Sequence, residues 1–372
     1  MKTLKRCLTL LLALLLLPAL GGCGEPSEEP EIYEVARESI STTYTYFFSD
    51  DEPWTEIHRG VTEYDERGLA TKLAVNLFDD VNTVTLDYSF NEQGDPESFS
   101  FLFAGQEFRV LLENRYEEGQ LREAVITELQ LEGEPLDLAA KSDSYWGEVL
   151  HRVFEGVLFP ALEHYVGYRD CCLRLEGTEQ QVRWEGGRQV YVCRTENNRI
   201  LYETEITRTE DGGDLSTQWT RPLVENVTIQ TSGITREIDG QHYLRRVVLY
   251  YPDGSQIELR FRFEDGGRNE EGEALRLAFA DEILVEGRGK AEEMAARLEE
   301  YRELPFAEYT LREDGRVRSC LLRNHLLNAV FEENYLSEAR IWYDEQDRQL
   351  RRETLIDTDT ARLLSVEERE YR

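Results

Sequence analysis

Cys23 is the residue whose position most clearly implies chemistry, and it ends the stretch Leu20-Gly21-Gly22-Cys23. Three basic residues among the first six precede an almost wholly apolar run over residues 7–20. A short basic segment followed by such a run is typical of an export signal, and the run is too short to span a bilayer comfortably. The sequence therefore predicts that residues 1–22 are a signal peptide.

This ending resembles the lipobox of bacterial lipoproteins, in which the signal is cleaved before the cysteine and the sulfur receives a diacylglyceryl group. The resemblance covers the first 23 residues. It implies that Cys23 is the lipidation site and that the lipid attaches the protein to the cell membrane on the extracytoplasmic side. Residues 23–35 would then be the lipidated cysteine and an acidic tether, because residues 24–31 contain no apolar side chain.

The composition limits the partners. The chain carries 75 acidic and 42 basic residues, for a net charge of −33. Nucleic acids bind through Lys and Arg that neutralise phosphates, so we expect no nucleic-acid partner. The membrane, reached through the N-terminal lipid, is the partner that the sequence indicates, and an envelope protein, a polysaccharide or a lipid ligand stay open. An apolar content of 40% is ample for a folded core.

The rest of the sequence shows no strong motif for catalysis or metal binding. The five histidines do not have zinc-ligand spacing, and neither acidic loop (residues 210–214 and 264–271) has the order of an EF-hand. No nucleophile elbow or Walker loop occurs. We therefore predict no catalytic residue, no cofactor and no metal site. Trp184 and Trp342 lie beside predicted turns, where a sugar could stack, although cross-strand packing is the commoner role of such residues.

Four cysteines remain beyond the signal and the lipobox, and they allow three disulfide connectivities: Cys171, Cys172, Cys193 and Cys320. Neighbours on a strand point to opposite faces, so Cys171 and Cys172 are poor partners for each other. Cys193 is predicted two strands away from Cys172, which is too far for a bridge. Free buried thiols are the expectation, with the redox state left open.

Strict alternation of apolar and polar residues recurs along the chain. One face of a predicted strand carries Val84, Leu86, Tyr88 and Phe90, and the other carries Thr85, Asp87 and Ser89. A period of two indicates a strand with one buried and one wet face, which favours antiparallel sheets. We therefore predict a mainly β fold of antiparallel β-meander sheets, curved or partly closed.

A repeated turn separates the strands. In most copies an aromatic residue ends a strand, acidic or amide residues begin the turn, and Gly takes the position of positive φ. The copies begin at Tyr64, Phe90, Tyr116, Tyr251, Phe263 and Tyr343, the last with Asp347 in place of Gly. They are similar to YD repeats, the Tyr-Asp-x-x-Gly hairpins of bacterial surface proteins, which in that family build scaffolding sheets.

Two stretches have helical periodicity, residues 143–166 and 290–303, and Pro160 should kink or split the first. They fall at the joints of three predicted segments: a first β-meander over 36–140, a helix with a second β-meander over 141–287, and a helix with a C-terminal β segment over 288–372.

These features together favour a non-catalytic, lipid-anchored envelope protein with a binding or scaffolding role. A second hypothesis is a carrier of an apolar ligand such as a lipid, in a cavity walled by the alternating Phe and Tyr positions. A third is a hydrolase of envelope polysaccharide, which would require two close carboxylates in a cleft lined by Trp.

Overall fold

The structure, a computed structural model, describes residues 35–47, 52–77, 80–136, 154–196, 200–223, 231–323, 325 and 336–372. The predicted mainly β fold is confirmed. The strands of the first half are β1 (Val35–Tyr46), β2 (Trp54–Tyr64), β3 (Ala70–Leu77), β4 (Asp80–Phe90), β5 (Pro96–Phe103), β6 (Gln106–Glu117), β7 (Gln120–Leu131), β8 (Glu134–Leu136), β9 (Cys172–Leu175), β10 (Gln181–Glu185) and β11 (Arg188–Glu196). Those of the second half are β12 (Ile200–Arg208), β13 (Asp214–Pro222), β14 (Ser232–Ile238), β15 (Leu244–Tyr250), β16 (Gln256–Arg268), β17 (Ala274–Glu286), β18 (Ala307–Leu311), β19 (Val317–Arg323), β20 (Leu336–Tyr343), β21 (Gln349–Asp357) and β22 (Ala361–Tyr371).

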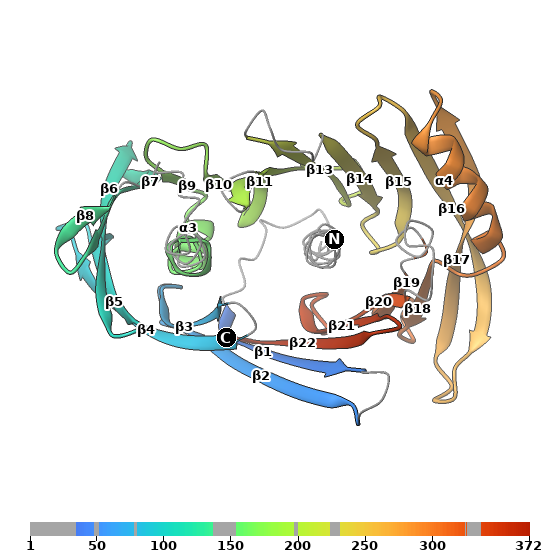
Figure 1. The fold of residues 1–372 in the computed structure, drawn as a ribbon, viewed down its shortest axis with the longest axis horizontal. Coiled ribbons are helices and arrows are strands. Elements are labelled where there is room, and N and C mark those ends of the chain that lie inside the picture. The colour runs from blue at the N-terminus through green and yellow to red at the C-terminus, as the bar shows by residue number, and fades with distance from the viewer. Residues whose placement is uncertain are drawn as a thin grey trace.

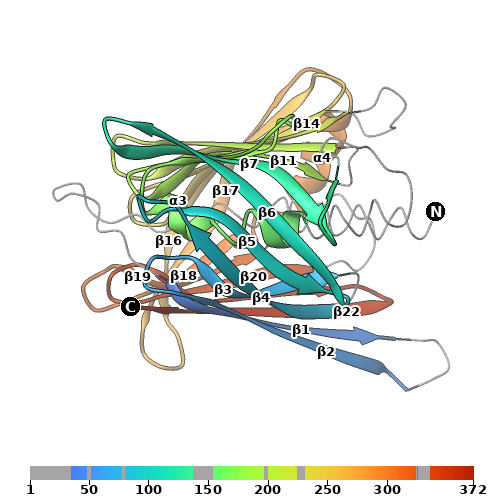
Figure 2. The ribbon, with the colours of Figure 1, turned by 90° about the vertical axis from the view of Figure 1, so that its left-hand side faces the viewer.

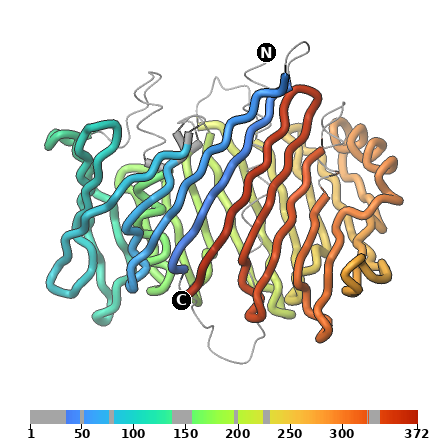
Figure 3. Tube along the Cα trace, turned by 90° about the horizontal axis from the view of Figure 1, so that it is seen from below, coloured from blue at the N-terminus to red at the C-terminus, as the bar shows by residue number. Residues whose placement is uncertain are grey.

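The sheet closes on itself. Within the described residues, 21 strands form a ring, and β8 hangs from β7 outside it. The ring closes where β1 pairs with β22, from Val35 opposite Tyr371 to Tyr46 opposite Ala361. Figure 3 shows these first and last strands side by side. The expectation of curved or partly closed sheets is therefore corrected to a fully closed barrel.

One seam in the ring is parallel. β7 and β9 run in the same direction, with Glu123 opposite Cys172 and Ile126 opposite Leu175, while every other pairing among the described strands is antiparallel. A ring of alternating directions needs an even number of strands, so a ring of 21 requires one parallel pair. The chain between β7 and β9 makes this pair possible because a parallel neighbour needs a long crossover.

Tight turns confirm most of the predicted hairpins. In eight described turns the first residue accepts a hydrogen bond from the N–H three residues on and donates to the carbonyl four residues on; they begin at Asp65, Asn91, Thr209, Asp239, Tyr251, Asn269, Arg312 and Asp344. The fourth residue has positive φ, as at Gly254 (81°) and Asp347 (60°). The turn predicted at Phe263 is wrong. β16 continues to Arg268 through a bulge, and the turn begins at Asn269, whose side chain accepts the N–H groups of Glu271 and Glu273.

A short helical segment fills one side of the barrel (Figure 1). It consists of the π-helical turn η1 (Phe154–Leu158) and the helix α3 (Glu163–Gly167), and we call residues 154–167 the plug. The helix predicted over 143–166 is thus split in its described part into two short pieces around Pro160, as predicted, because proline cannot donate a helical hydrogen bond. Residues 137–153 lie outside the described part.

The plug packs with the inner faces of the surrounding strands into an apolar cluster, which we call the plug cluster. Leu158, Phe159, Leu162 and Tyr165 are fully buried there, against Phe99 and other wall residues. Each such side chain contributes about 1.5–3 kcal/mol on burial. The plug cluster therefore fixes η1 and α3 inside the wall.

The opposite side of the barrel closes by direct contact of its two walls. Ile234 and Ile257 of one wall share a second apolar cluster with Tyr309 and Ile341 of the other. The helix α4 (Lys290–Leu298), followed by the 3-10 turn η2 (Glu299–Tyr301), packs Ala291, Met294 and Leu298 into it. The predicted helix at 290–303 is confirmed over these residues.

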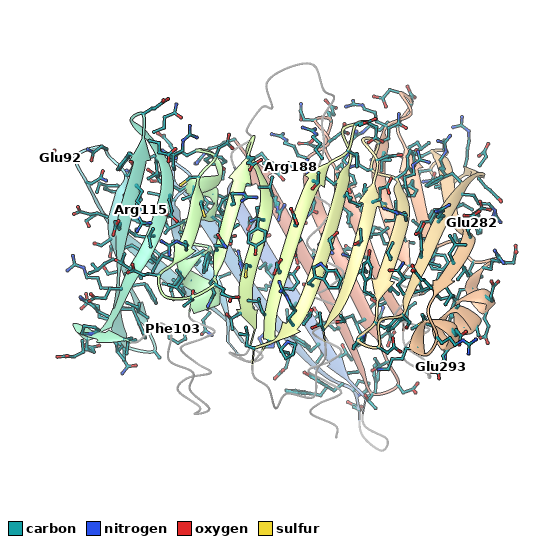
Figure 4. All side chains as sticks on the ribbon, turned by 90° about the horizontal axis from the view of Figure 1, so that it is seen from above. Glu92, Phe103, Arg115, Arg188, Glu282 and Glu293 are labelled. Atoms are coloured by element: carbon teal, nitrogen blue, oxygen red, sulfur yellow. The ribbon has the colours of Figure 1, made fainter. Side chains whose placement is uncertain are left out.

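The outer wall is covered by ion pairs between neighbouring strands, as the side chains in Figure 4 illustrate around Arg115 and Glu282. Arg115 and Arg174 both contact Glu123, at 2.7 and 2.8 Å. Arg260 contacts Glu282 at 3.1 Å. A charged side chain on the lipid face of a membrane barrel costs up to about 2–4 kcal/mol at the bilayer midplane. The outer faces of β6, β7, β9, β16 and β17 are therefore better suited to water than to hydrocarbon.

Candidate functional site

A polar strip lies between the two apolar clusters on the inside of the barrel. One wall contributes the inward residues of β12, β13 and β14, and the facing wall contributes those of β21, β22 and β1. Figure 2 shows the two walls from the side, with β11 and β14 in the upper one and β22 and β1 in the lower one. We call this the central strip: Tyr202, Thr204, Ser216, Gln218, Thr220 and Arg236 on the first wall, and Arg352, Thr354, Ser365, Glu367 and Thr42 on the second.

The inward direction of these residues follows from register. Arg236 lies two residues from Ile234 on β14, and Arg352 pairs with Ile341 of β20. Both isoleucines belong to the second apolar cluster, which joins the two walls from inside. Side chains two apart on a strand, or directly opposite on neighbouring strands, share a face. Arg236 and Arg352 therefore both point into the barrel.

A chain of hydrogen bonds holds Arg236 in place. Its Nη1 donates to Oε1 of Gln218 at 3.1 Å, and Nε2 of Gln218 donates to the Tyr202 hydroxyl at 2.6 Å. The network crosses β14, β13 and β12 on the inner face. The pKa of Arg236 is lowered to about 10, chiefly by burial and also by the positive charge of Arg352, whereas Tyr202 opposes the shift. Two guanidinium groups thus lie close enough to repel each other.

The second wall brings Arg352 and Glu367 together. They are register partners on β21 and β22. Burial lowers the pKa of Arg352, and the carboxylate of Glu367 opposes that shift. The next inward residue, Arg369, contacts Glu38 of β1 at 2.9 Å. On this wall Glu367 therefore lies beside Arg352, and Glu38 beside Arg369, so each positive charge has a negative neighbour.

Two hydroxyl groups of the central strip lack a partner among the described residues. Thr204 is 3% exposed and Ser216 is 1% exposed, and neither side-chain oxygen has a hydrogen bond there. Ser216 lies directly opposite Arg236 in the ladder, and Thr204 lies opposite Gln218. A buried hydroxyl without a hydrogen bond costs about 1–3 kcal/mol. These atoms are therefore suited to a ligand or to water.

Solvent reaches the other wall from inside. Ser365, Glu367 and Tyr44 point into the barrel, yet all three are half-buried and not sealed off. A barrel of this many strands encloses more space than its wall side chains can fill; barrels of about 16–18 strands hold water-filled channels. The plug and the second apolar cluster occupy two opposite sides of the barrel interior, and the central strip lines the space between them.

The residues predicted from sequence are not brought together. Cys23 lies outside the described residues. The four other cysteines are free thiols; Cys171, Cys193 and Cys320 are buried, and Cys172 is half-buried. Burial raises the pKa of the Cys171 thiol to about 12, so it is a poor nucleophile. No group of three or more His, Cys, Asp or Glu residues suited to a metal ion occurs in the described chain.

The tryptophans and acidic loops have structural surroundings. Trp184 is buried in the plug cluster, and Trp342 lies on the outer face near the guanidinium of Arg351, 5.5 Å from its ring centre. The loop at 210–214 is one of the tight turns, with the Asp211 carboxylate accepting the Gly213 N–H at 3.2 Å. Residues 264–268 belong to β16.

The central strip was not predicted from the sequence. The signal was present in β13, where Asp214, Ser216, Gln218 and Thr220 occupy every second position that should be apolar. A strand whose inward face is polar where the other strands of the chain place apolar residues indicates a wet or ligand-lined interior. Arg236 and Arg352 carry no such local signal, because each stands alone among apolar or mixed neighbours.

The architecture is that of a closed β-barrel with an internal plug. No family model matches the chain, and no curated protein does. Among solved structures, the chain is similar to a porin-like protein from Bacteroides vulgatus ATCC 8482, with 11% identity over 91% of this chain and 99% of that one at a TM-score of 0.24. OpdQ of Pseudomonas aeruginosa follows, with 7% identity over 93% of this chain and 100% of that one at a TM-score of 0.18. Both likenesses are too weak to carry an argument about function.

The structure overturns the expected functions. A scaffolding or binding role was expected for meander sheets that are curved or partly closed, but the sheet is a fully closed barrel around the central strip. The expected cavity for an apolar ligand is wrong because Phe99, Phe101 and Phe108 pack in the plug cluster. The hydrolase expectation fails as well, because Trp184 is buried among apolar residues and Trp342 lies on the outer wall.

Proposed function

We propose that the protein is a channel-type barrel that lets small polar solutes pass through its interior. The observation that carries this proposal is the closed ring of strands around the central strip. A ring of this size leaves room for an aqueous interior, and the half-buried inward residues of β1 and β22 agree with water inside.

The charged outer wall is an argument for a barrel that lies in water beside a membrane. Its ion pairs would be costly in hydrocarbon, so the passage is proposed to run through an aqueous compartment. Among the described residues no helix has the length and apolar character needed to cross a membrane.

We further propose that Cys23 carries a lipid that holds the barrel at the membrane on its extracytoplasmic side. The Leu20-Gly21-Gly22-Cys23 stretch supports this placement. The lipid would then keep the passage close to the membrane without inserting the wall into it.

Thiol accessibility in detergent-free solution tests the passage. Ser365→Cys places a thiol on the inner face of β22, and Val366→Cys places one on the outer face of the same strand. Both native side chains are half-buried, so the two variants form a matched pair. Each is treated with a small anionic methanethiosulfonate and with a large polyethylene-glycol maleimide, and peptide mass mapping separates the new thiol from the native ones.

We expect both thiols to react with the small reagent, and only the thiol at position 366 to react with the large one. The proposal is wrong if the small reagent modifies position 366 but leaves position 365 intact, because the interior would then be closed to solutes. It is also wrong if the large reagent modifies both positions equally, because the ring would then be open.

A further inference from the structure

The hairpin of β1 and β2 carries a row of aromatic rings on the face that continues the inner face of the barrel. Tyr46 lies opposite Trp54, and Tyr44 lies opposite Glu56. Thr42 of the central strip lies two residues from Tyr44, and side chains two apart on a strand share a face. All of these side chains therefore point the same way, and the row leads along β1 into the central strip.

The three rings form a continuous stack. The centroids of Tyr44 and Tyr46 are 6.3 Å apart, with planes 8° from parallel, and those of Tyr46 and Trp54 are 5.2 Å apart at 23°. Trp54 ends the stack, and its side chain is 51% exposed. Among the tryptophans that the structure describes, it alone is exposed. Packing within the hairpin thus accounts for one side of this ring and leaves the rest of its surface open to a ligand.

The hairpin leaves the ring of strands near these rings. β2 pairs with β3 only through Glu63 and Tyr64, the last two residues of β2. Farther toward Trp54, β2 crosses close over β3: a Cβ at Gly60 would lie 2.6 Å from that of Ala74, so only glycine permits the approach. Figure 1 shows the tip of the hairpin outside the ring. No described strand pairs with this edge of β2, and the aromatic row is reachable from solution.

Hydrogen-bonding side chains lie among the rings. Glu56 lies between Trp54 and His58 on the same face of β2, and its side chain is 31% exposed. The ring of His58 meets that of Tyr44 edge to face at 5.4 Å and lies opposite Thr42 in the ladder. A carboxylate accepts hydrogen bonds, whereas an imidazole and a hydroxyl can donate or accept them. Apolar ring surface and hydrogen-bonding groups therefore share one face, over about 13 Å of strand.

This combination is suited to a carbohydrate. A sugar ring has apolar faces of C–H groups, which pack on the electronegative faces of aromatic rings, and hydroxyl groups at its edge, which donate to carboxylates. A fatty chain would bury the Glu56 carboxylate at a cost. An anionic ligand would be repelled by the same carboxylate, in a chain whose net charge is −33. The chemistry therefore favours a neutral oligosaccharide.

We propose that Tyr44, Tyr46, Trp54 and Glu56 form a binding face for a neutral oligosaccharide at one entrance of the barrel. The aromatic rings hold the sugar rings, and Glu56 accepts hydrogen bonds from their hydroxyl groups. Thr42 continues the face toward the central strip. That the bound sugar is also a solute of the passage rests on the proposed function, and it names the class of solute that the passage would select.

Isothermal titration calorimetry of the purified protein with maltohexaose, cellohexaose and chitohexaose tests the binding face. We expect saturable binding of at least one of the three. Trp54→Ala should weaken that binding by about tenfold or more, and Trp54→Phe should weaken it less because a ring remains. Trp342→Ala removes a ring from the outer face of β20 and should leave the affinity unchanged. Absence of binding for all three sugars, or equal losses in Trp54→Ala and Trp342→Ala, would overturn the proposal.

Glu56→Gln keeps the inference testable if Trp54→Ala fails to fold, because the amide has nearly the same shape and the side chain is partly exposed. A purely structural role of Glu56 predicts unchanged affinity for the sugar. The proposed face predicts binding that is about threefold to tenfold weaker, because a charged acceptor is lost.

Ile57→Ser distinguishes a carbohydrate from other occupants of the hairpin. Ile57 is 56% exposed on the opposite face of β2, so the variant should bind the sugar as the parent does. If the hairpin contacts a lipid surface, Ile57→Ser and Trp54→Ala will both reduce sedimentation with phosphatidylcholine vesicles. If it contacts a second copy of the chain, both will change the mass measured by light scattering. Either result, with no hexasaccharide bound, would reject the carbohydrate face.

The accessibility of position 365 separates the two proposals. A reactive thiol in Ser365→Cys with no hexasaccharide binding would leave the passage standing and reject the face. Binding that Trp54→Ala and Glu56→Gln both weaken, with an unreactive thiol, would keep the face and reject the passage. Binding that slows modification of a reactive thiol would support both, since the hydroxyl oxygens of Ser365 and Thr42 are 3.4 Å apart.

Discussion

The hydroxyl group of Tyr88 lies 3.1 Å from the carbonyl oxygen of Ala161 and 2.9 Å from that of Ala70. Ala161 belongs to the plug and Ala70 to β3, so one side chain of β4 ties the inner wall to the plug. The Tyr88 side chain is half-buried, and burial of its hydroxyl raises the pKa well above its usual value. This residue therefore acts as a neutral hydrogen-bond donor at the junction.

Tyr88→Phe should lower the free energy of unfolding by about 1–2 kcal/mol, because both carbonyl oxygens lose the hydroxyl as a donor, although that of Ala161 keeps the N–H of Ala70, at 3.3 Å. Urea unfolding followed by circular dichroism measures the loss. Ser100→Ala on the outer face of neighbouring β5 is the control, and it should change stability by no more than about 0.5 kcal/mol. Equal stability of Tyr88→Phe and the parent protein would mean that the junction contributes nothing.

Stability should fall as the pH drops below about 6.5. Burial lowers the pKa of His164 in the plug, and it also lowers those of His242 and His325. The unfolded chain therefore takes up protons before the folded chain does, and the folded state loses stability as the pH falls from about 6.5 through the lowered values. Urea unfolding at pH 7.5 and pH 5 measures this difference.

His164→Gln should reduce the pH dependence, because it removes one of these buried bases. The free energy of unfolding of the variant at pH 7.5 will also be lower. The substitution removes the edge-to-face contact between the His164 and Tyr64 rings, whose centroids are 4.3 Å apart. An identical slope against pH in the variant and the parent would show that His164 does not contribute to the dependence.

Gly254→Val should destabilise the turn between β15 and β16 by about 1–3 kcal/mol. Gly254 has φ of 81°, which a β-branched residue adopts only under strain. No atom lies within 4 Å of a Cβ built at this position, so the penalty comes from the backbone alone. Gly254→Asn is the matched control, because asparagine tolerates positive φ, and it should melt close to the parent protein.

Cys23→Ala should abolish incorporation of a fatty-acid probe in a bacterial host that processes lipoproteins. Cys7→Ala, within the predicted signal peptide, should leave the labelling intact. Labelled Cys23→Ala protein would disprove the assignment of the lipidation site.

The sequence predicted the local structure well, because local structure depends on neighbouring residues. The alternation around Val84 and Leu86 indicated which side chains are buried, and both lie in the plug cluster. The turn at Asp65 was recognisable because the side chain of its first residue accepts the N–H groups of Arg67 and Leu69. The turn near Phe263 was misplaced because Gly266 and Gly267 form a bulge, and a bulge uses the same residue types as a turn.

Closure of the ring could not be predicted, because it depends on partners that are remote in the chain. Thr42 and Ser365, whose hydroxyl oxygens are 3.4 Å apart across the seam, are separated by 323 residues. Alternation specifies a buried face but not what covers it, so the second hypothesis placed the inward Phe residues around a ligand cavity, where the structure has the plug. The central strip was hidden for the same reason, since Arg236 and Arg352 come together only in the closed ring.

The pairing of β1 with β22 also has a consequence for how the protein is made. No shorter intermediate can complete the ring, because β1 can pair with β22 only after β22 has left the ribosome. Until then two strand edges stay open, and open edges pair readily with other chains. Deletion of a few residues of β22 should therefore cause aggregation out of proportion to the contacts removed, and the nascent chain should depend on chaperones until β22 has been synthesised.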